Sequence, residues 1–392
     1  MAGPADVIVV GAGVQGASLA FHLARRGVRV LVVERRTIAA GATGRSSGLV
    51  RMHYDLLSDA RLAQASLPWF QRWDALVGGD CGFTVTGFVQ LVGPDKADRL
   101  RANIADLRSI GVETEVVDPG RIRELVPALH VADDELGAWE PDSGYADPAA
   151  AATGFLRGAL DAGAQLVQGA EVTAIPTTGG RVTGVETTKG AFSAPVVVIA
   201  AGGWAGQVAG LAGVTLPISV WRHDVAYLGT APGVEIPFPA VIDDASAMYF
   251  RPEGDALVLI GLEDHTATDG SPDRETESVE AGFDTRATER IVRRMPALAE
   301  GSFRATHSGQ DGLTEDERPL LGPVGDAGPD GLWLDCGHSG TGFKTSPAVG
   351  LSLAEWIVDG EPRTVDIRPY GLERFAAGRP LRGPHAYGRI WR

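Results

Sequence analysis

A glycine-rich turn near the N-terminus lies between a predicted strand and a predicted helix. A buried apolar run at 7–10 leads into GAGVQG at 11–16, a helical pattern follows, and a second apolar run at 30–33 ends at Glu34. In a βαβ unit of this kind the first glycine permits the tight turn, the second lets a pyrophosphate approach the backbone, and the third lets the helix pack on the strand. The helix N-terminus offers N–H groups to the phosphates, and Glu34 can accept hydrogen bonds from an adenosine ribose. The sequence therefore predicts that the chain binds a dinucleotide.

Composition narrows the class of protein. The 392 residues suffice for two domains or for one large α/β body with an insertion, and the formal net charge of −15 argues against a nucleic-acid partner. No apolar run is long enough to span a bilayer, and the nucleotide motif begins close to Met1. We therefore expect no secretory leader, no membrane partner and a cytoplasmic location. Cys81 and Cys336 lie far apart, and neither they nor the eight histidines form a metal-ligand spacing, so no metal site is predicted.

The hydrophobic pattern changes along the chain. Helices are expected over 60–76, 95–110, 119–126, 149–162, 285–295 and 348–358, and strands over 83–92, 165–175, 181–188, 194–201 and 331–335, with alternating strands from 216 to 264. The buried run at 194–201 ends in a second glycine turn, as expected where a parallel sheet meets its ligand. The polar stretch 264–277 is expected as a surface loop. This pattern predicts an α/β fold with a doubly wound, Rossmann-like part and a mixed sheet.

Four motifs in fixed order carry a resemblance to a known family. The fingerprint at 11–16, GATGRSSGLVR at 41–51, VVVIAAGGWA at 196–205 and GHSGTGFKTSPAVG at 337–350 resemble the FAD-dependent amine and amino-acid oxidoreductases of the D-amino-acid oxidase type. The branch of sarcosine oxidase, glycine oxidase and dimethylglycine dehydrogenase is the most similar. The resemblance implies a discontinuous FAD-binding domain, an α+β substrate domain with a mixed sheet, and a flavin ring between them. The implied bounds are 1–82, 147–218 and 319–392 for the FAD-binding domain, and 83–146 and 219–318 for the substrate domain.

The resemblance also implies which residues bind FAD. These positions belong to the N-terminal turn, the loop after the second strand, the second glycine turn and the late glycine turn. They are Gly11, Gly13, Val14, Gln15, Gly16, Glu34, Arg35, Thr43, Arg45, Ser46, Ser47, Val172, Ala201, Gly202, Trp204, Gly340, Thr341, Gly342, Phe343 and Lys344.

Lys344 is the strongest candidate for substrate binding. Only three of the 35 basic residues are lysines, and this one follows a glycine turn. In similar sarcosine oxidases the lysine of GFK binds the substrate carboxylate, and a compact ammonium suits that role beside a flavin ring. Arg51 is expected to hold a second carboxylate oxygen in a bidentate pair. The alternative for Lys344 is a surface lysine at a helix start.

Three further residues are candidates at the substrate face. His53 and Tyr54 follow the loop expected to face the flavin, and Tyr249 lies on a strand of the expected substrate domain together with Arg251. Side chains two apart on a strand share one face, so Tyr249 and Arg251 are expected on the same side. A purely structural role stays open for His53, Tyr249 and Arg251.

The chain departs from its relatives at three positions that bear on the flavin. The stretch 307–316 lacks the cysteine that attaches FAD in monomeric sarcosine oxidases, and Arg45 lies in the loop where dimethylglycine dehydrogenases use a histidine. We therefore expect FAD to be bound noncovalently. Leu259 matches a lysine that assists the reaction of reduced flavin with O2, and leucine cannot stabilise a developing superoxide.

The predicted activity follows from the resemblance. The substrate is expected to be an amine or amino acid with a carboxylate, similar to sarcosine, glycine or a cyclic amino acid, which passes a hydride to flavin N5 and becomes an imine. The electron acceptor is either O2 or an unknown redox partner. The alternatives are the catalytic FAD subunit of a heteromeric dehydrogenase, a nicotinamide-dependent dehydrogenase, and a flavoprotein without this turnover.

Overall fold

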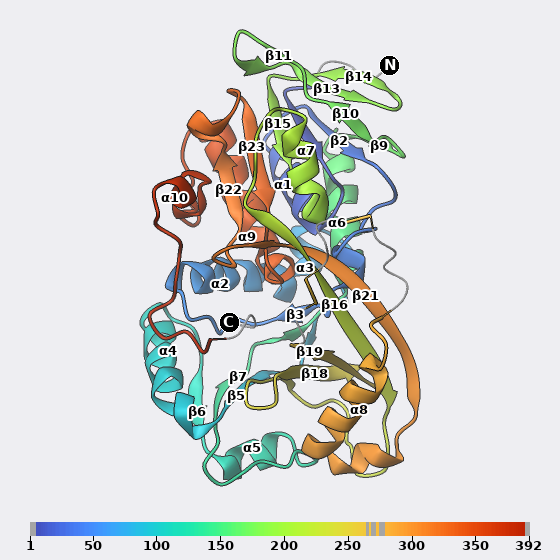
Figure 1. Ribbon diagram of the computed structural model, residues 1–392, viewed down its shortest axis with the longest axis vertical. Helices are drawn as coiled ribbons and strands as arrows, with labels where there is room; N and C mark the ends of the chain where they lie inside the picture. The colour runs from blue at the N-terminus through green and yellow to red at the C-terminus, as the bar shows by residue number, and fades with distance from the viewer. Residues whose placement is uncertain (1–4, 264–265, 268–271, 274–278, 389–392) are drawn as a thin grey trace.

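Two large β-sheets lie at opposite ends of an elongated molecule (Figure 1). The structure is a computed structural model, and it describes residues 5–263, 266–267, 272–273 and 279–388. Most of the polar stretch 264–277, expected as a surface loop, lies outside the described residues.

The first sheet has six strands in the order β22-β23-β15-β1-β2-β9. β1 (Val7–Val10) lies near its centre and pairs in parallel with β15 and β2. All of β1 is buried, because helices cover one face of the sheet and a smaller α and β layer covers the other. The other strands are β2 (Val30–Glu34), β9 (Gln165–Gln168), β15 (Val196–Ile199), β22 (Leu320–Pro323) and β23 (Leu332–Cys336).

Three helices pack against one another on the first face of this sheet. α1 (Val14–Ala24) contacts both α6 (Pro148–Asp161) and α9 (Gly342–Asp359). α6 begins as the sequence predicts, because the Asp147 carboxylate accepts hydrogen bonds from the first backbone N–H groups of the helix. α1 and α9 both begin at the edge where the parallel strands end, so their N-termini face the same region.

The second sheet is mixed and has nine strands, in the order β20-β16-β19-β18-β17-β5-β7-β6, with β21 paired to β16. β16 (Ile218–Gly229) and β21 (Phe303–Thr314) form a long antiparallel pair that extends toward the first sheet (Figure 1). The other strands are β5 (Phe88–Val92), β6 (Glu115–Val117), β7 (Leu136–Glu140), β17 (Ala240–Asp243), β18 (Met248–Glu253), β19 (Leu257–Leu262) and β20 (Thr266–Ala267). The helices around it are α4 (Ala97–Ser109), α5 (Pro119–Leu125) and α8 (Phe283–Arg294).

Shorter elements connect and cover the two sheets. β3 (Leu49–Val50), β8 (Gly144–Tyr145) and β4 (Thr84–Val85) form a small sheet between them. The remaining elements are α2 (Leu57–Gln71), α3 (Trp73–Leu76), α7 (Ala205–Gly210), α10 (Glu373–Ala376), β10 (Val172–Ala174), β11 (Thr177–Thr178), β12 (Arg181–Val182), β13 (Gly184–Thr187) and β14 (Gly190–Ser193).

The predicted α/β class with a parallel sheet and a mixed sheet is confirmed, and several element bounds are corrected. The single strand expected over 165–175 is two strands, β9 and β10, which belong to different sheets. The strand expected over 83–92 breaks at Gly87. The part that forms β5 is buried on both faces, because separate apolar clusters cover each face. The helix expected from 348 begins earlier, at Gly342. The exact division of the chain into domains stays a prediction.

Within the described residues, no helix combines the length and the apolar character that a bilayer crossing requires.

Candidate functional site

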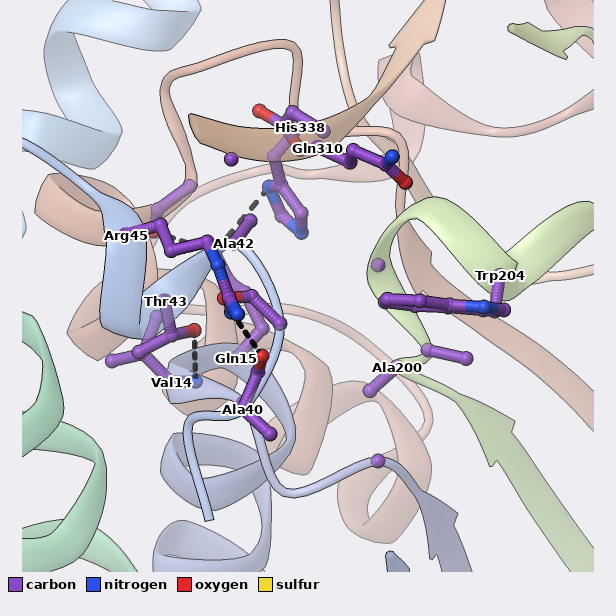
Figure 2. A pocket seen from close by; sticks show the side chains of 18 of the residues that line it. Val14, Gln15, Ala40, Ala42, Thr43, Arg45, Ala200, Trp204, Gln310 and His338 are labelled. Carbon is purple, nitrogen blue, oxygen red and sulfur yellow. Dashed lines mark hydrogen bonds between the residues drawn. The ribbon is translucent and has the colours of Figure 1, made fainter. Parts of the chain in front are cut away.

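A cavity of about 420 Å³ lies where the parallel strands end and the long β16–β21 pair arrives (Figure 2). Its volume falls within the range of roughly 300–1,000 Å³ that small-molecule and cofactor sites occupy. Most residues predicted to bind FAD line it. They are Gly11, Gly13, Val14, Gln15, Glu34, Arg35, Thr43, Arg45, Ser46, Ser47, Val172, Ala201, Gly202, Trp204, Gly340, Gly342 and Phe343.

The turn between β1 and α1 is shaped by glycine. Gly11 has a φ of +112°, and a Cβ on it would lie 2.4 Å from the carbonyl oxygen of Ala200 on the neighbouring strand turn. The backbone N–H of Val14 donates to Oγ1 of Thr43 at 3.0 Å, which ties the start of α1 to the loop after β2. The two glycine turns and this loop therefore form one wall of the cavity. Gly16, also predicted to bind FAD, does not line the cavity and packs against Gly11 instead.

Glu34 holds a fixed carboxylate at one end of the cavity. Its two oxygens accept hydrogen bonds from the backbone N–H groups of Ala12, at 2.8 Å, and Arg36, at 2.6 Å. Arg35 lies over the ring of Trp204, 4.7 Å from its centroid, and the indole N–H donates to Asp273 at 2.8 Å. This end of the cavity therefore combines a carboxylate acceptor with an aromatic face, which suits a nucleoside.

A polar group that sequence reasoning missed lies beside the start of α1. Nε2 of His338 lies 3.0 Å from Oδ1 of Asp335, and Nδ1 lies 3.3 Å from Nε2 of Gln15, which donates to the carbonyl of Gly342 at 2.8 Å. His338 and Gln15 are visible together in Figure 2. Asp335 comes at the carboxyl end of β23, and His338 lies within the late glycine motif. The sequence could have identified both residues as candidates, because ligands bind outside the carboxyl ends of parallel strands.

The long strands of the second sheet also contribute to the cavity. Trp221 and His223 come from β16, and Gln310 and Asp311 come from β21. Asp311 accepts hydrogen bonds from the backbone N–H of Gly340 at 2.6 Å and from its neighbour in sequence at 2.8 Å. Burial raises the pKa of the Asp311 carboxyl. Strand periodicity alone does not reveal that these strands reach the first sheet.

A second, smaller cavity of about 30 Å³ adjoins the first. The two cavities share Ser46, Ser47, Tyr249, Gly340 and Phe343 as lining residues. The smaller one is also lined by Arg51, Thr341 and Lys344, all of which were predicted site residues. The structure thus brings two cationic side chains to the edge of the cavity where most of the predicted cofactor residues lie.

Lys344 lies in the first turn of α9 and is almost fully buried, with 6% of its surface exposed. Its Nζ lies 3.4 Å from the carbonyl oxygen of Gly340 and 6.0 Å from the centre of the Tyr54 ring. Burial, with the nearby charge of Arg51, lowers the pKa of the Lys344 ammonium well below its ordinary value. In the described part of the chain no carboxylate lies within 4.0 Å of this nitrogen. Because Lys344 is buried, the alternative that it is a surface lysine at a helix start is wrong.

Arg51 is buried beside Lys344, with 3% of its surface exposed. Its guanidinium lies over the ring of Tyr54, 4.5 Å from the centroid, and Nη1 donates to the carbonyl oxygen of His53. His53 and Tyr54 line neither cavity. Both contact Arg51, His53 through its carbonyl oxygen and Tyr54 through its ring.

Tyr249 is the residue of β18 that lines both cavities. Its hydroxyl lies 2.9 Å from Nε2 of His223, and the two rings are stacked with centroids 5.6 Å apart. Burial raises the pKa of the Tyr249 hydroxyl well above its ordinary value, so the hydroxyl stays protonated. Arg251, two residues further along, donates to the backbone of Ser47 at 2.6 Å and packs on Tyr145, a structural role.

Neither cysteine takes part in the two cavities. Cys81 and Cys336 are free and buried, and neither lines either cavity. Among the described residues, no group of three or more histidine, cysteine, aspartate or glutamate side chains is arranged to hold a metal ion.

Comparison with known proteins gives one family over most of the chain. The profile of the FAD dependent oxidoreductase family (DAO) matches residues 6–356. Human mitochondrial sarcosine dehydrogenase is 28% identical over 391 residues, which cover 95% of this chain but 41% of that protein. The chain thus spans about two fifths of the length of that relative. The sarcosine oxidase subunit beta of Rhodobacter capsulatus is 27% identical, over 95% of this chain and 89% of the subunit.

A solved structure with a similar fold covers the whole site. The crystal structure of L-proline dehydrogenase from P. horikoshii is similar with a TM-score of 0.90 and 25% sequence identity, over 97% of this chain and 100% of that one.

Proposed function

Because this chain belongs to the family of FAD-dependent oxidoreductases, we propose that it oxidises the C–N bond of a small amino acid to an imine. The substrate class we favour is a secondary amino acid, similar to sarcosine or proline. Two of the relatives act on such compounds by name. The observation that carries the proposal is the pair of buried cations, Arg51 and Lys344, on a small cavity that opens from the larger one.

The chemistry of the residues that line the larger cavity fits FAD. At Gly11 a Cβ would collide with the backbone of Ala200, so the turn stays open to a pyrophosphate only with glycine there. The buried Oε1 of Gln15 has no hydrogen-bond partner among the described residues, and Gln15 lines the cavity. Gln15, Glu34 and Ser47 are therefore residues that would hold the cofactor. When bound, FAD supplies the hydride acceptor for the C–H bond next to the substrate nitrogen.

Arg51 and Lys344 bind the substrate carboxylate in this account. A buried guanidinium and a buried ammonium together compensate one carboxylate, which gains more from them than it would at an exposed site. The two positive charges also disfavour a protonated substrate amine, and the reaction requires the neutral amine. The same pair therefore orients the substrate and keeps its nitrogen reactive.

Tyr249 and His223 are placed to handle the amine proton. Tyr249 lines both cavities, and its hydroxyl lies 2.9 Å from Nε2 of His223, which lines the larger one. A proton that leaves the substrate nitrogen can therefore pass to this hydrogen-bonded pair.

Matched substrates test the proposal. Anaerobic holoenzyme is mixed with sarcosine or L-proline, and separately with dimethylamine or pyrrolidine, which lack the carboxylate. We expect the flavin absorbance to bleach with the amino acids at least about tenfold more efficiently, since charge-assisted hydrogen bonds to the carboxylate would be lost with the amines. Equal bleaching by both members of each pair would contradict the proposal.

We further propose that FAD is held noncovalently. In support, neither cysteine lines the cavity. Arg45, Ser46 and Ser47 lie in the loop where the resemblance implies a histidine for dimethylglycine dehydrogenases. Acid precipitation of the holoenzyme should leave the yellow colour in the supernatant. Colour that stays with the pellet would show a covalent bond.

The electron acceptor and the assembly are proposed from two separate observations. Leu259 is buried in an apolar cluster with Tyr249 and lines neither cavity, so it adds no positive charge there. We therefore propose that O2 reoxidises the reduced flavin slowly and that the electron acceptor is not O2. Stopped-flow reoxidation in air-saturated buffer tests this directly.

The relative from Rhodobacter capsulatus is a subunit of its enzyme, which favours a heteromeric complex as the second candidate. Affinity purification from the native host distinguishes a complex from a single chain.

A further inference from the structure

The segment after α10 crosses from the first sheet to the second (Figure 1). It leaves the first sheet beside Asp316, whose carboxylate accepts from the backbone N–H of Leu381 at 2.9 Å. It then passes Asp55 so closely that a Cβ on Gly383 would lie 2.4 Å from both the carboxyl carbon and the backbone oxygen of Asp55. We call residues 377–388 the strap.

The strap ends on α4, in the other half of the molecule. Asn103 donates to the carbonyl of His385 at 3.1 Å, and Arg99 donates to the carbonyl of Ala386 at 2.7 Å. The next residue, Tyr387, has 4% of its surface exposed and belongs to the apolar cluster that α4 forms with β5 and β7. The end of the strap is thus fixed by two hydrogen bonds and by a buried ring.

Tyr387 contacts His53. Its hydroxyl lies 2.9 Å from Nε2 of the imidazole, and the two rings are stacked with 7° between their planes and 5.9 Å between their centroids. His53 is fully buried, and burial with the nearby charge of Arg51 lowers its pKa to about 3. The imidazole is therefore neutral at physiological pH and serves as a fixed hydrogen-bonding ring.

His53 in turn holds Arg51. The carbonyl oxygen of His53 accepts a hydrogen bond from Nη1 of Arg51, and the ring of the next residue, Tyr54, lies under the guanidinium. The direction of the guanidinium therefore depends on where the backbone at 53–54 lies. That backbone is anchored through the His53 ring to the strap.

We propose that Tyr387 is a positioning residue for Arg51, acting through His53, so that the strap sets the geometry of carboxylate binding. This inference rests on the proposed function, in which Arg51 binds the substrate carboxylate. The strap joins the part of the molecule around the first sheet to the part around the second. The way these two parts pack together therefore affects the position of the Arg51 guanidinium. Tyr387 itself does not line either cavity.

The test is the affinity of the holoenzyme for acetate, measured from the change in flavin absorbance. Tyr387→Phe keeps the stacked ring and removes only the hydroxyl. We expect its acetate Kd to rise about threefold to tenfold, the range for one lost hydrogen bond, with FAD content and melting temperature close to those of the wild type. Tyr227→Phe is the matched control, because it removes a hydroxyl from another tyrosine beside a histidine ring, outside both cavities.

Two more variants, Arg51→Lys and Arg51→Lys combined with Tyr387→Phe, distinguish a failure of the proposed role of Arg51 from a failure of the role inferred for Tyr387. The inference predicts that Arg51→Lys weakens acetate binding and that adding Tyr387→Phe weakens it little further, because both changes act on one group. If Arg51→Lys leaves the acetate Kd unchanged, the proposed role of Arg51 fails and the inference falls with it. If Arg51→Lys weakens binding but Tyr387→Phe matches the Tyr227→Phe control, the inference alone is wrong.

Discussion

Lys344 is a buried cation for which the described chain provides no anionic partner within ion-pair distance. A buried charge without compensation is costly, and a bound carboxylate relieves that cost. This is why we propose that Lys344 forms an ion pair with the substrate carboxylate.

Replacing Lys344 with methionine keeps the apolar stem and removes the charge. We expect the KM for sarcosine or L-proline to rise roughly 10- to 100-fold, the range for losing a hydrogen bond to a charged group. Lys189→Met is the matched control, since Lys189 is exposed and lines neither cavity. An unchanged KM in Lys344→Met would remove this residue from the substrate site.

The lowered pKa of Lys344 gives carboxylate binding a pH dependence. The ammonium is fully present below that pKa and is lost as the pH rises through it, which happens below the ordinary lysine value of 10.5. Acetate affinity should therefore fall as the pH rises through that pKa, at a pH below 10.5, and Lys344→Met should abolish this fall. An acetate Kd in the wild type that stays constant up to pH 10.5 would contradict the assignment.

Residue identities in this site were predictable where a motif carried them and not elsewhere. Lys344 and Arg51 lie in or next to glycine-rich motifs, and both line the small cavity. His53 and Tyr54 lie in the same motif region, yet neither lines either cavity, and both are buried. Asp311 has no local motif at all and reaches the cavity only through the length of β21.

At the scale of elements, the β1–α1 turn is the part of the fold that the sequence specifies most fully. Its glycine at position 11 has a φ of +112° and contacts the neighbouring strand turn directly. The strand break between β9 and β10 was not predictable in the same way. The chain leaves one sheet for another there, and the backbone N–H of Ala170 donates to the carbonyl of Glu34, a tertiary contact.

Gly11→Ala tests the turn. The added Cβ would lie 2.4 Å from the Ala200 carbonyl oxygen, so the turn must move into the space expected for the pyrophosphate. We expect FAD affinity to fall by at least about tenfold, as for loss of more than one hydrogen bond. Gly27→Ala is the control: it also has a positive φ in the same βαβ unit, but nothing lies within 4 Å of its added Cβ. Equal FAD affinity in both variants would refute this account of the turn.

At the scale of the whole molecule, function depends on two sheets meeting. The first sheet provides the glycine turns and Glu34, and the long strands β16 and β21 bring residues of the second sheet to the same cavity. Alternating patterns along the chain predicted two kinds of sheet. They did not predict how far β16 and β21 extend toward the first sheet, because that length is set by contacts between distant segments. The course of the strap could not be predicted from hydrophobic periodicity, because residues 377–388 form no helix or strand.

The central claim is that one FAD in the large cavity is reduced by an amino acid bound through Arg51 and Lys344. The most direct measurement is the visible spectrum of the purified protein under anaerobic conditions, before and after addition of sarcosine and, separately, L-proline. The account predicts flavin bands near roughly 375 and 450 nm that bleach on addition of at least one of the two. A protein that carries no flavin and takes up no added FAD, or a flavin that neither compound bleaches, would contradict it.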